Sequence, residues 1–265
     1  MDRDKMKRIE IFEDTTKLFK SNNQLKNDIE FSKKNTKLYK EDFDYNLPEN
    51  PNKNCKISVI NSRTFKASEG LENVVVLNFA SATNPGGGVK TGSNAQEECL
   101  CRCSTLYPCL TSGNLFNDYY KYHRDRKDTF YTDRIIYSKN ITVFKEDIRE
   151  PILMDKDKWY KVDIITSPAP NLREVKKVNQ NELLQIFKTR IEKILKVAII
   201  NGNTNIVLGA FGCGAFKNPP FLVARAYKEV LDKYKGYFDN IVFAVLITPG
   251  QNGDENFKTF SQVIK

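Results

Sequence analysis

Short apolar runs alternate along most of the chain with longer stretches in which apolar residues recur at helical spacing. The short runs are rich in β-branched residues and cover 57–60, 74–78, 134–137, 162–166, 205–208 and 241–247. The helical patterns cover about 95–110, 181–200 and 219–234. Strands that alternate with helices of this length predict an α/β fold, in which a mixed sheet is flanked by helices on both faces.

The first 54 residues follow a different pattern. They are rich in Lys, Asn, Asp and Glu, and their apolar positions 9, 12, 18 and 19, then 25, 29 and 31, lie at helical spacing. A Pro- and Asn-rich stretch at 47–53 is typical of a loop. We therefore predict a helical N-terminal extension, residues 1–54, packed on an α/β domain of residues 55–265.

Ligands bind such sheets at the carboxyl ends of the strands, so a site is expected in the loops after 74–78, 162–166 and 205–208. Three consecutive glycines lie in the first of these loops: Gly86, Gly87 and Gly88. Glycine destabilises a helix or strand by about 0.5–1 kcal/mol, so its use here indicates a backbone that takes positive φ or approaches a ligand closely. Phosphate and ribose are common ligands of such loops. The alternative is a flexible turn.

This loop leads into the segment SNAQEE (93–98), at the start of a predicted helix. A capping box that uses Ser93 or Asn94 would explain an acidic residue in the first turn. It explains one carboxylate, whereas the segment has two. Adjacent helical positions are about 100° apart, so Glu97 and Glu98 point in different directions. One of them can hold a ligand while the other does chemistry.

A second glycine-containing loop, FGCGAFKNPP at 211–220, follows the run 205–208. Gly212 and Gly214 permit close approach to the backbone, and Pro219 or Pro220 suits the first turn of a helix. A glycine-rich loop that leads to a helix N-terminus is suited to binding a diphosphate.

Charge and histidine content narrow the chemistry. The chain has 42 basic and 33 acidic residues, and its formal net charge of +9 favours anionic partners such as nucleic acid, nucleotides or a polyanionic substrate. A basic surface without functional meaning is an equally good explanation. The single histidine, His123, excludes a catalytic His pair and a multi-His metal site. Catalysis must therefore use carboxylates, Cys, Lys or the backbone.

Four of the six cysteines, at 99, 101, 103 and 109, lie on one predicted helix. Helical positions two apart do not face each other, and the paired CxxC spacing of zinc sites is missing. We expect reduced thiols in an intracellular compartment and no metal. No apolar run approaches the roughly 20 residues that cross a bilayer. The N-terminus MDRDKMKRIE lacks the apolar core of a secretory signal.

The glycines and carboxylates together resemble a known signature. Three glycines, seven residues and then Gln96-Glu97-Glu98 are similar to the signature of poly(ADP-ribose) glycohydrolases. The flanking NFASATNPGGG and LCRCSTLY resemble the bacterial branch, as do the segments 119–124, 137–138, 143–144 and 165–170. The resemblance covers about 55–250. It implies a macrodomain-like catalytic domain and a glycosidase that needs no cofactor.

The resemblance also implies roles for individual residues. Glu98 is expected to be the general acid that protonates the leaving oxygen and then the base that activates water. Glu97 and Asn84 would bind the distal ribose hydroxyls, and the second loop would bind the diphosphate. Phe216 is expected either to stack on the adenosine part or to belong to the core. The residues expected to bind substrate are Asn84, Gly86, Gly87, Gly88, Gln96, Ser167, Gly212, Cys213, Gly214, Ala215 and Phe216.

Other functions stay open at this point. A binding module would read ADP-ribose without cleaving it, although such a module does not need Gln96-Glu97-Glu98. A related hydrolase would remove ADP-ribose from a protein side chain or a nucleic-acid base. A nucleic-acid-binding protein is the third alternative, but no RRM, KH or zinc-finger signature is present. The expected partners are poly(ADP-ribose), ADP-ribose and ADP-ribosylated proteins, and the chain is expected to be monomeric.

Overall fold

The computed structural model describes residues 2–248 and 253–264. In these residues, seven strands form one sheet in the order β1-β4-β5-β3-β6-β7-β2. Five neighbouring strands are parallel: β5 (Tyr160–Ser167), β3 (Val74–Phe79), β6 (Asn205–Leu208), β7 (Asn240–Ala244) and β2 (Lys56–Ile60). Strand β4 (Ile135–Val143) is antiparallel to β5, and the short edge strand β1 (Lys37–Tyr39) is antiparallel to β4. The predicted α/β fold with a mixed sheet is confirmed.

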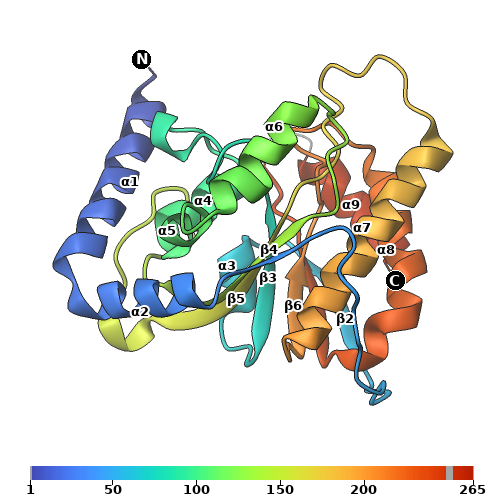
Figure 1. Ribbon diagram of the computed structural model, residues 1–265, viewed down its shortest axis with the longest axis horizontal. Coiled ribbons are helices and arrows are strands. Elements are labelled where there is room, and N and C mark those ends of the chain that lie inside the picture. Colours follow the sequence, from blue (N-terminus) through green and yellow to red (C-terminus); the bar gives the residue numbers. More distant parts are fainter. Residues whose placement is uncertain (1, 249–252, 265) are drawn as a thin grey trace.

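Helices cover both faces of the sheet (Figure 1). Along β3, Val75 and Leu77 face one core and Val74 and Val76 face the other, which is the period-two alternation of a central strand. The first core is covered by α7 (Gln180–Ile200), α8 (Pro220–Tyr234) and α9 (Gly253–Val263). The second is covered by α3 (Thr64–Ser68), α4 (Gln96–Cys103) and α5 (Leu106–Leu110). In the described residues, no helix is long and apolar enough to cross a membrane.

The N-terminal segment contributes two helices and a strand. Helices α1 (Arg3–Ser21) and α2 (Asn23–Lys34) lie outside α4 and α5, on the left of Figure 1. Asn22 separates them, because its side chain accepts a hydrogen bond from the Leu25 N–H and caps α2. Strand β1 was not predicted: the segment was expected to be helical, yet it supplies one edge of the sheet. The boundary between residues 54 and 55 stays a prediction.

Several predicted elements have different bounds in the structure. The run predicted over 134–137 is β4, which extends to Val143. The helix expected over 95–110 is broken at Ser104, which is extended and forms a bridge with Val143, while the Thr105 N–H donates to Thr142 O. Strand β7 ends at Ala244, and further along the Ile247 N–H donates to the side chain of Asn61. Within the described residues, seven helical elements were not predicted: α3, α6 (Tyr122–Arg126), α9, the 3₁₀ helices Val89–Thr91, Lys156–Lys158 and Lys235–Tyr237, and the π-helix Phe116–Lys121.

The carboxyl ends of β5, β3 and β6 are neighbours at one edge of the sheet, because these strands are parallel and adjacent. The loops that follow them are 168–179, 80–95 and 209–219. Phe79 lies at the end of β3, and Phe211 lies in the second glycine-containing loop, which follows β6. The centroids of their rings are 5.8 Å apart. The sheet topology therefore brings both glycine loops together, as the sequence predicted.

Candidate active site

The loop between β3 and α4 is shaped by its glycines. Gly86 and Gly87 have φ values of 68° and 59°, in the left-handed region that side chains disfavour. A Cβ atom on Gly87 would overlap Glu98 Oε1, and one on Gly88 would overlap the Ser93 side chain. The glycines therefore let the backbone close on a carboxylate, which a flexible turn would not require.

Glu98 is the carboxylate that the loop encloses. Its Oε1 accepts a hydrogen bond from the Gly88 N–H and its Oε2 accepts one from the Ala95 N–H, both at 2.8 Å. The residue is 6% exposed. Ala95 is the N-cap of α4, so the alternative explanation by a capping box through Ser93 or Asn94 does not hold. Glu98 itself reaches back to the cap, and its carboxylate joins the glycine loop to the helix N-terminus.

Glu97 points into the protein beneath the loop and is 2% exposed. Its Oε2 accepts from the Ser81 N–H at 2.8 Å, and its Oε1 accepts from Asn78 Nδ2 at 3.3 Å. Burial, helped by the charge of Glu98, raises the pKa of Glu97 to about 8. The two adjacent glutamates thus occupy different environments, as their angular separation on the helix predicted.

Gln96 ties the helix to the sheet. Its Oε1 accepts from the Phe79 N–H at 2.8 Å, and its Nε2 donates to Leu77 O at 2.7 Å and to Thr64 Oγ1 at 3.0 Å. Strand β3, helix α3 and helix α4 therefore meet at one side chain. This geometry fixes the start of α4, from which both carboxylates project.

Asn84 lies at the exposed rim of the same loop. Arg124, in α6, donates from Nε to Thr83 O at 2.7 Å and from a terminal nitrogen to Asn84 Oδ1 at 2.8 Å. The Arg124 guanidinium therefore fixes both the backbone at Thr83 and the side-chain amide of Asn84. The sequence placed Arg124 only in a segment similar to the family, without this role.

The second loop depends on Gly212 in a different way from Gly214. Gly212 has φ 76°, and a Cβ atom there would lie 2.5 Å from the Ala169 Cβ and 2.7 Å from Asn218 Nδ2. The same Asn218 amide donates to Pro170 O at 2.7 Å and to Gly212 O at 3.0 Å, which joins this loop to the one after β5. No described atom lies within 4 Å of a Cβ placed on Gly214, so its surroundings are open.

The remaining predicted residues differ in accessibility. Ser167 is fully buried at the end of β5, and its hydroxyl has no hydrogen-bond partner among the described residues. Cys213 is buried in the core, whereas Ala215 is exposed. Phe216 is half-buried, with the Arg173 guanidinium 5.6 Å from its ring centroid and the Tyr131 ring 6.4 Å away. It packs against the core without belonging fully to it.

Comparison with known proteins identifies the family. A family model described as the microbial-type PARG (poly(ADP-ribose) glycohydrolase) catalytic domain matches residues 7–146, which is more than half of the chain. The chain belongs to the microbial-type PARG family. The match begins inside α1 and includes the glycine loop and both glutamates. No curated protein sequence gives a significant match.

Solved PARG structures are similar over nearly the whole chain. The enzyme from Thermomonospora curvata has a TM-score of 0.82 and 29% identity, covering 97% of this chain and 98% of its own. Its complex with the inhibitor ADP-HPD has a TM-score of 0.81 and 30% identity, covering 96% and 98%. The Deinococcus radiodurans enzyme in complex with ADP-ribose has a TM-score of 0.75 and 33% identity, covering 89% and 96%.

Sequence reasoning missed several polar residues that support the candidate site. Asn78 is buried at the end of the apolar strand β3 and contacts Glu97. Arg102 is buried in the cysteine-rich helix and donates to Ser93 O at 2.8 Å. Asn218 is buried in the second loop. For Asn78 the available signal was a polar residue inside an otherwise apolar run, since such groups are retained only with partners. Arg102 and Asn218 do not lie in apolar runs, so the sequence offered no such signal for them.

His123 has a structural environment. Its Nδ1 donates to Tyr119 O at 2.8 Å, and its Nε2 lies 3.0 Å from Thr132 Oγ1. Burial lowers its pKa to about 4, so the ring is neutral at neutral pH. These contacts indicate a packed, hydrogen-bonded histidine that supports the structure.

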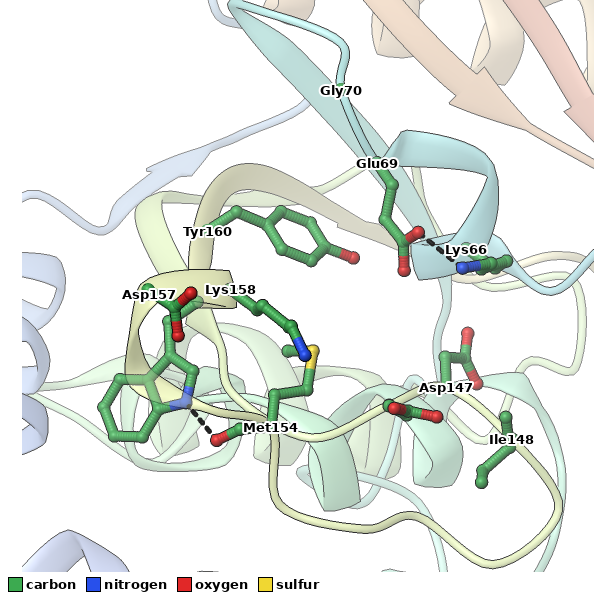
Figure 2. A pocket seen from close by; sticks show the side chains of 11 residues that line it. Lys66, Glu69, Gly70, Asp147, Ile148, Met154, Asp157, Lys158 and Tyr160 are labelled. Atoms are coloured by element: carbon green, nitrogen blue, oxygen red, sulfur yellow. Dashed lines mark hydrogen bonds and ion pairs between the residues drawn. The ribbon is translucent and has the colours of Figure 1, made fainter.

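A cavity of about 600 Å³ lies away from the glycine loops (Figure 2). It opens near Trp159 and Tyr160, where β5 begins, and near Gly70, which precedes β3. These are the amino ends of the strands, opposite the edge that carries the glutamates. At one side of its rim, Lys66 and Glu69 form an ion pair, drawn in Figure 2, with 2.6 Å between nitrogen and oxygen. This cavity is therefore separate from the candidate site.

The cysteines do not form a metal site in the part of the chain that the structure describes. All six are free thiols, and five of them are buried. Among residues 2–248 and 253–264, no group of three or more His, Cys, Asp or Glu side chains is placed to hold a metal ion. Burial raises the pKa of Cys101 and Cys103 well above the ordinary value.

Proposed function

We propose that this protein is a poly(ADP-ribose) glycohydrolase that cleaves the ribose–ribose O-glycosidic bonds of the polymer and releases ADP-ribose. The observation that carries the proposal is the pair of adjacent buried carboxylates, Glu97 and Glu98, enclosed by a glycine loop within the region that matches the PARG family model. The related structures with ADP-ribose and ADP-HPD support an ADP-ribose site. A module that only binds ADP-ribose would not need two adjacent carboxylates.

Glu98 is the proposed general acid. As the bond between the distal ribose C1 and the leaving oxygen breaks, the Glu98 carboxyl gives its proton to that oxygen and an oxocarbenium-like centre develops. Water then attacks this carbon and returns a proton to the carboxylate. The N–H groups of Gly88 and Ala95 hold the carboxylate in one position, which favours catalysis because the reacting groups need little reorganisation.

Glu97 is proposed to bind the hydroxyls of the distal ribose, with Asn84 at the rim. Glu97 is fixed from below by Ser81 and Asn78, so its position does not depend on substrate. Arg124 similarly orients the Asn84 amide before substrate arrives. Preorganised partners of this kind reduce the entropy that binding loses.

The second loop is proposed to bind the diphosphate. It leads into α8, whose first turn contains Pro220, so its backbone N–H groups and the helix N-terminus can face an anion. The open space at Gly214 gives a phosphate access to the backbone. Phe216, flanked by Arg173 and Tyr131, is proposed to stack on the adenosine part of the ligand.

Identification of the products tests the function. Pure protein is incubated with poly(ADP-ribose), and the products are separated by chromatography. Free ADP-ribose is expected. Intact polymer after long incubation with folded protein would reject the glycohydrolase proposal, and ADP-ribose binding by calorimetry would then favour a binding module. Release of ADP-ribose only from a modified protein or nucleic acid would favour the mono-ADP-ribosyl hydrolase.

A further inference from the structure

Helix α1 packs directly on the outer side of the glycine loop. Arg8 Nε donates to Gly92 O at 2.7 Å, where the loop turns toward α4. Gly92 has φ 75°, and a Cβ atom there would overlap the Lys5 backbone oxygen and lie 3.1 Å from Ile9 Cγ1. The glycine therefore permits the helix backbone and the loop backbone to touch, which a side chain at Gly92 would prevent.

A second contact supports the start of the loop. The ring of Phe12, buried on α1, meets the ring of Tyr107 edge to face, with centroids 5.2 Å apart. Tyr107 lies under Gly86, since a Cβ there would be 2.8 Å from its ring, and Lys90 Nζ is 5.4 Å from the ring centroid. Through Tyr107, α1 therefore supports both Gly86 and the 3₁₀ helix that contains Lys90.

A third set of contacts fixes α1 itself. Thr15 Oγ1 donates to Arg102 O at 2.7 Å, and Arg102 in turn holds Ser93 O. Lys145, almost fully buried, donates to Asp14 at 2.7 Å and to Ile11 O at 3.2 Å. The helix is thus anchored to α4 and to the end of β4, independently of its contact with the loop.

The inner side of the same loop holds Glu98. The N–H groups of Thr91 and Ser93 both donate to Gly88 O, at 3.0 and 3.1 Å, so Gly92 and Gly88 belong to one compact turn. The N–H of Gly88 then donates to Glu98 Oε1. The turn therefore lies between α1 on one side and the proposed acid on the other.

We propose that α1 is a positioning element of the active site and that Arg8 is its positioning residue. This inference rests on the proposed function. Glycines have the greatest conformational freedom, so a loop that contains Gly86, Gly87, Gly88 and Gly92 needs external contacts to keep one geometry. Arg8 supplies such a contact from outside, and it keeps the Gly88 N–H at hydrogen-bond distance from Glu98. Arg8 does not touch the substrate.

Steady-state kinetics of three variants of the full chain test the role of Arg8. In Arg8→Gln, kcat on poly(ADP-ribose) is expected to fall about tenfold, as for loss of one hydrogen bond from a charged group. KM, ADP-ribose affinity and the unfolding midpoint should stay near wild-type values. Arg8→Lys keeps a cationic donor and should recover most of the rate. Lys7→Gln, on the exposed side of α1, is the matched control and should behave as wild type.

Two kinetic outcomes would overturn the proposal. One is an Arg8→Gln enzyme with the wild-type kcat. The other is a variant in which kcat, ADP-ribose affinity and the unfolding midpoint all decline together, because Arg8 would then only stabilise the fold.

Amide hydrogen exchange gives a readout that needs no turnover. In Arg8→Gln, the Gly88 N–H is expected to exchange at least about fivefold faster than in wild type, because local opening governs exchange. The same amide in Lys7→Gln should be unchanged. Equal exchange in all three proteins would refute the positioning role. If wild-type protein left the polymer intact, the proposed function would fail, whereas this measurement would still decide whether Arg8 holds the loop.

Discussion

Replacing Glu97 by Gln should make the protein more stable and less able to bind ADP-ribose. The carboxyl is buried, and its pKa is raised from 4.5 to about 8. Gln resembles the protonated form and can accept from the Ser81 N–H. If the Asn78 amide rotates by 180°, it presents an acceptor to the new NH₂ group. The substitution therefore removes an ionisable group whose charged form is unfavourable at this position.

The magnitude follows from proton linkage. Between pH 4.5 and 8 the folded protein keeps the Glu97 proton that the unfolded chain releases, so stability falls as pH rises through this window. Each pH unit corresponds to about 1.4 kcal/mol, which gives a penalty on the order of 3 kcal/mol at pH 7. Glu97→Gln should lack this penalty. The difference in unfolding free energy between Glu97→Gln and wild type should be smallest near pH 5 and should increase up to pH 8.

Urea unfolding at pH 5, 6, 7 and 8 measures this difference, with Glu13→Gln, an exposed substitution on α1, as control. ADP-ribose affinity at pH 8 should fall about tenfold, because Gln cannot offer a charged acceptor to ribose hydroxyls. A variant less stable than wild type at pH 8, or a difference that does not change with pH, would refute the assignment of a raised pKa. Unchanged ADP-ribose affinity would show that Glu97 does not contact the ribose.

Three other outcomes are expected. Glu98→Gln should lower turnover by about 10²–10⁴-fold with little change in ADP-ribose affinity, as for loss of a general acid; near-normal turnover would mean that Glu97 is the next candidate. Gly214→Val should weaken ADP-ribose binding in calorimetry without loss of stability, since a Cβ there meets nothing in the described structure; unchanged affinity would place the diphosphate elsewhere. Activity should survive EDTA, and complete loss restored by one divalent ion would contradict the carboxylate mechanism.

Local features of this site were readable from the sequence. The strands at 74–78 and 205–208 were correctly placed, because central parallel strands buried on both faces appear as continuous apolar runs. The requirement for glycine at 86 and 87 is a property of single φ angles. The different directions of Glu97 and Glu98 follow from the 100° step of a helix. None of these needs knowledge of distant residues.

Tertiary structure decided the features that depend on contacts far apart in the chain. The polar N-terminal segment supplies β1 because β4 offers it an open edge, and the helix expected over 95–110 breaks because Ser104 and Thr105 bond to β4 instead. The raised pKa of Glu97 arises from its burial beneath the glycine loop, and the local sequence does not predict this burial. Arg8 and Gly92 are 84 positions apart. Their contact exists because α1 folds back over the loop, and pairing of this kind is fixed by the packing of whole elements rather than by local sequence.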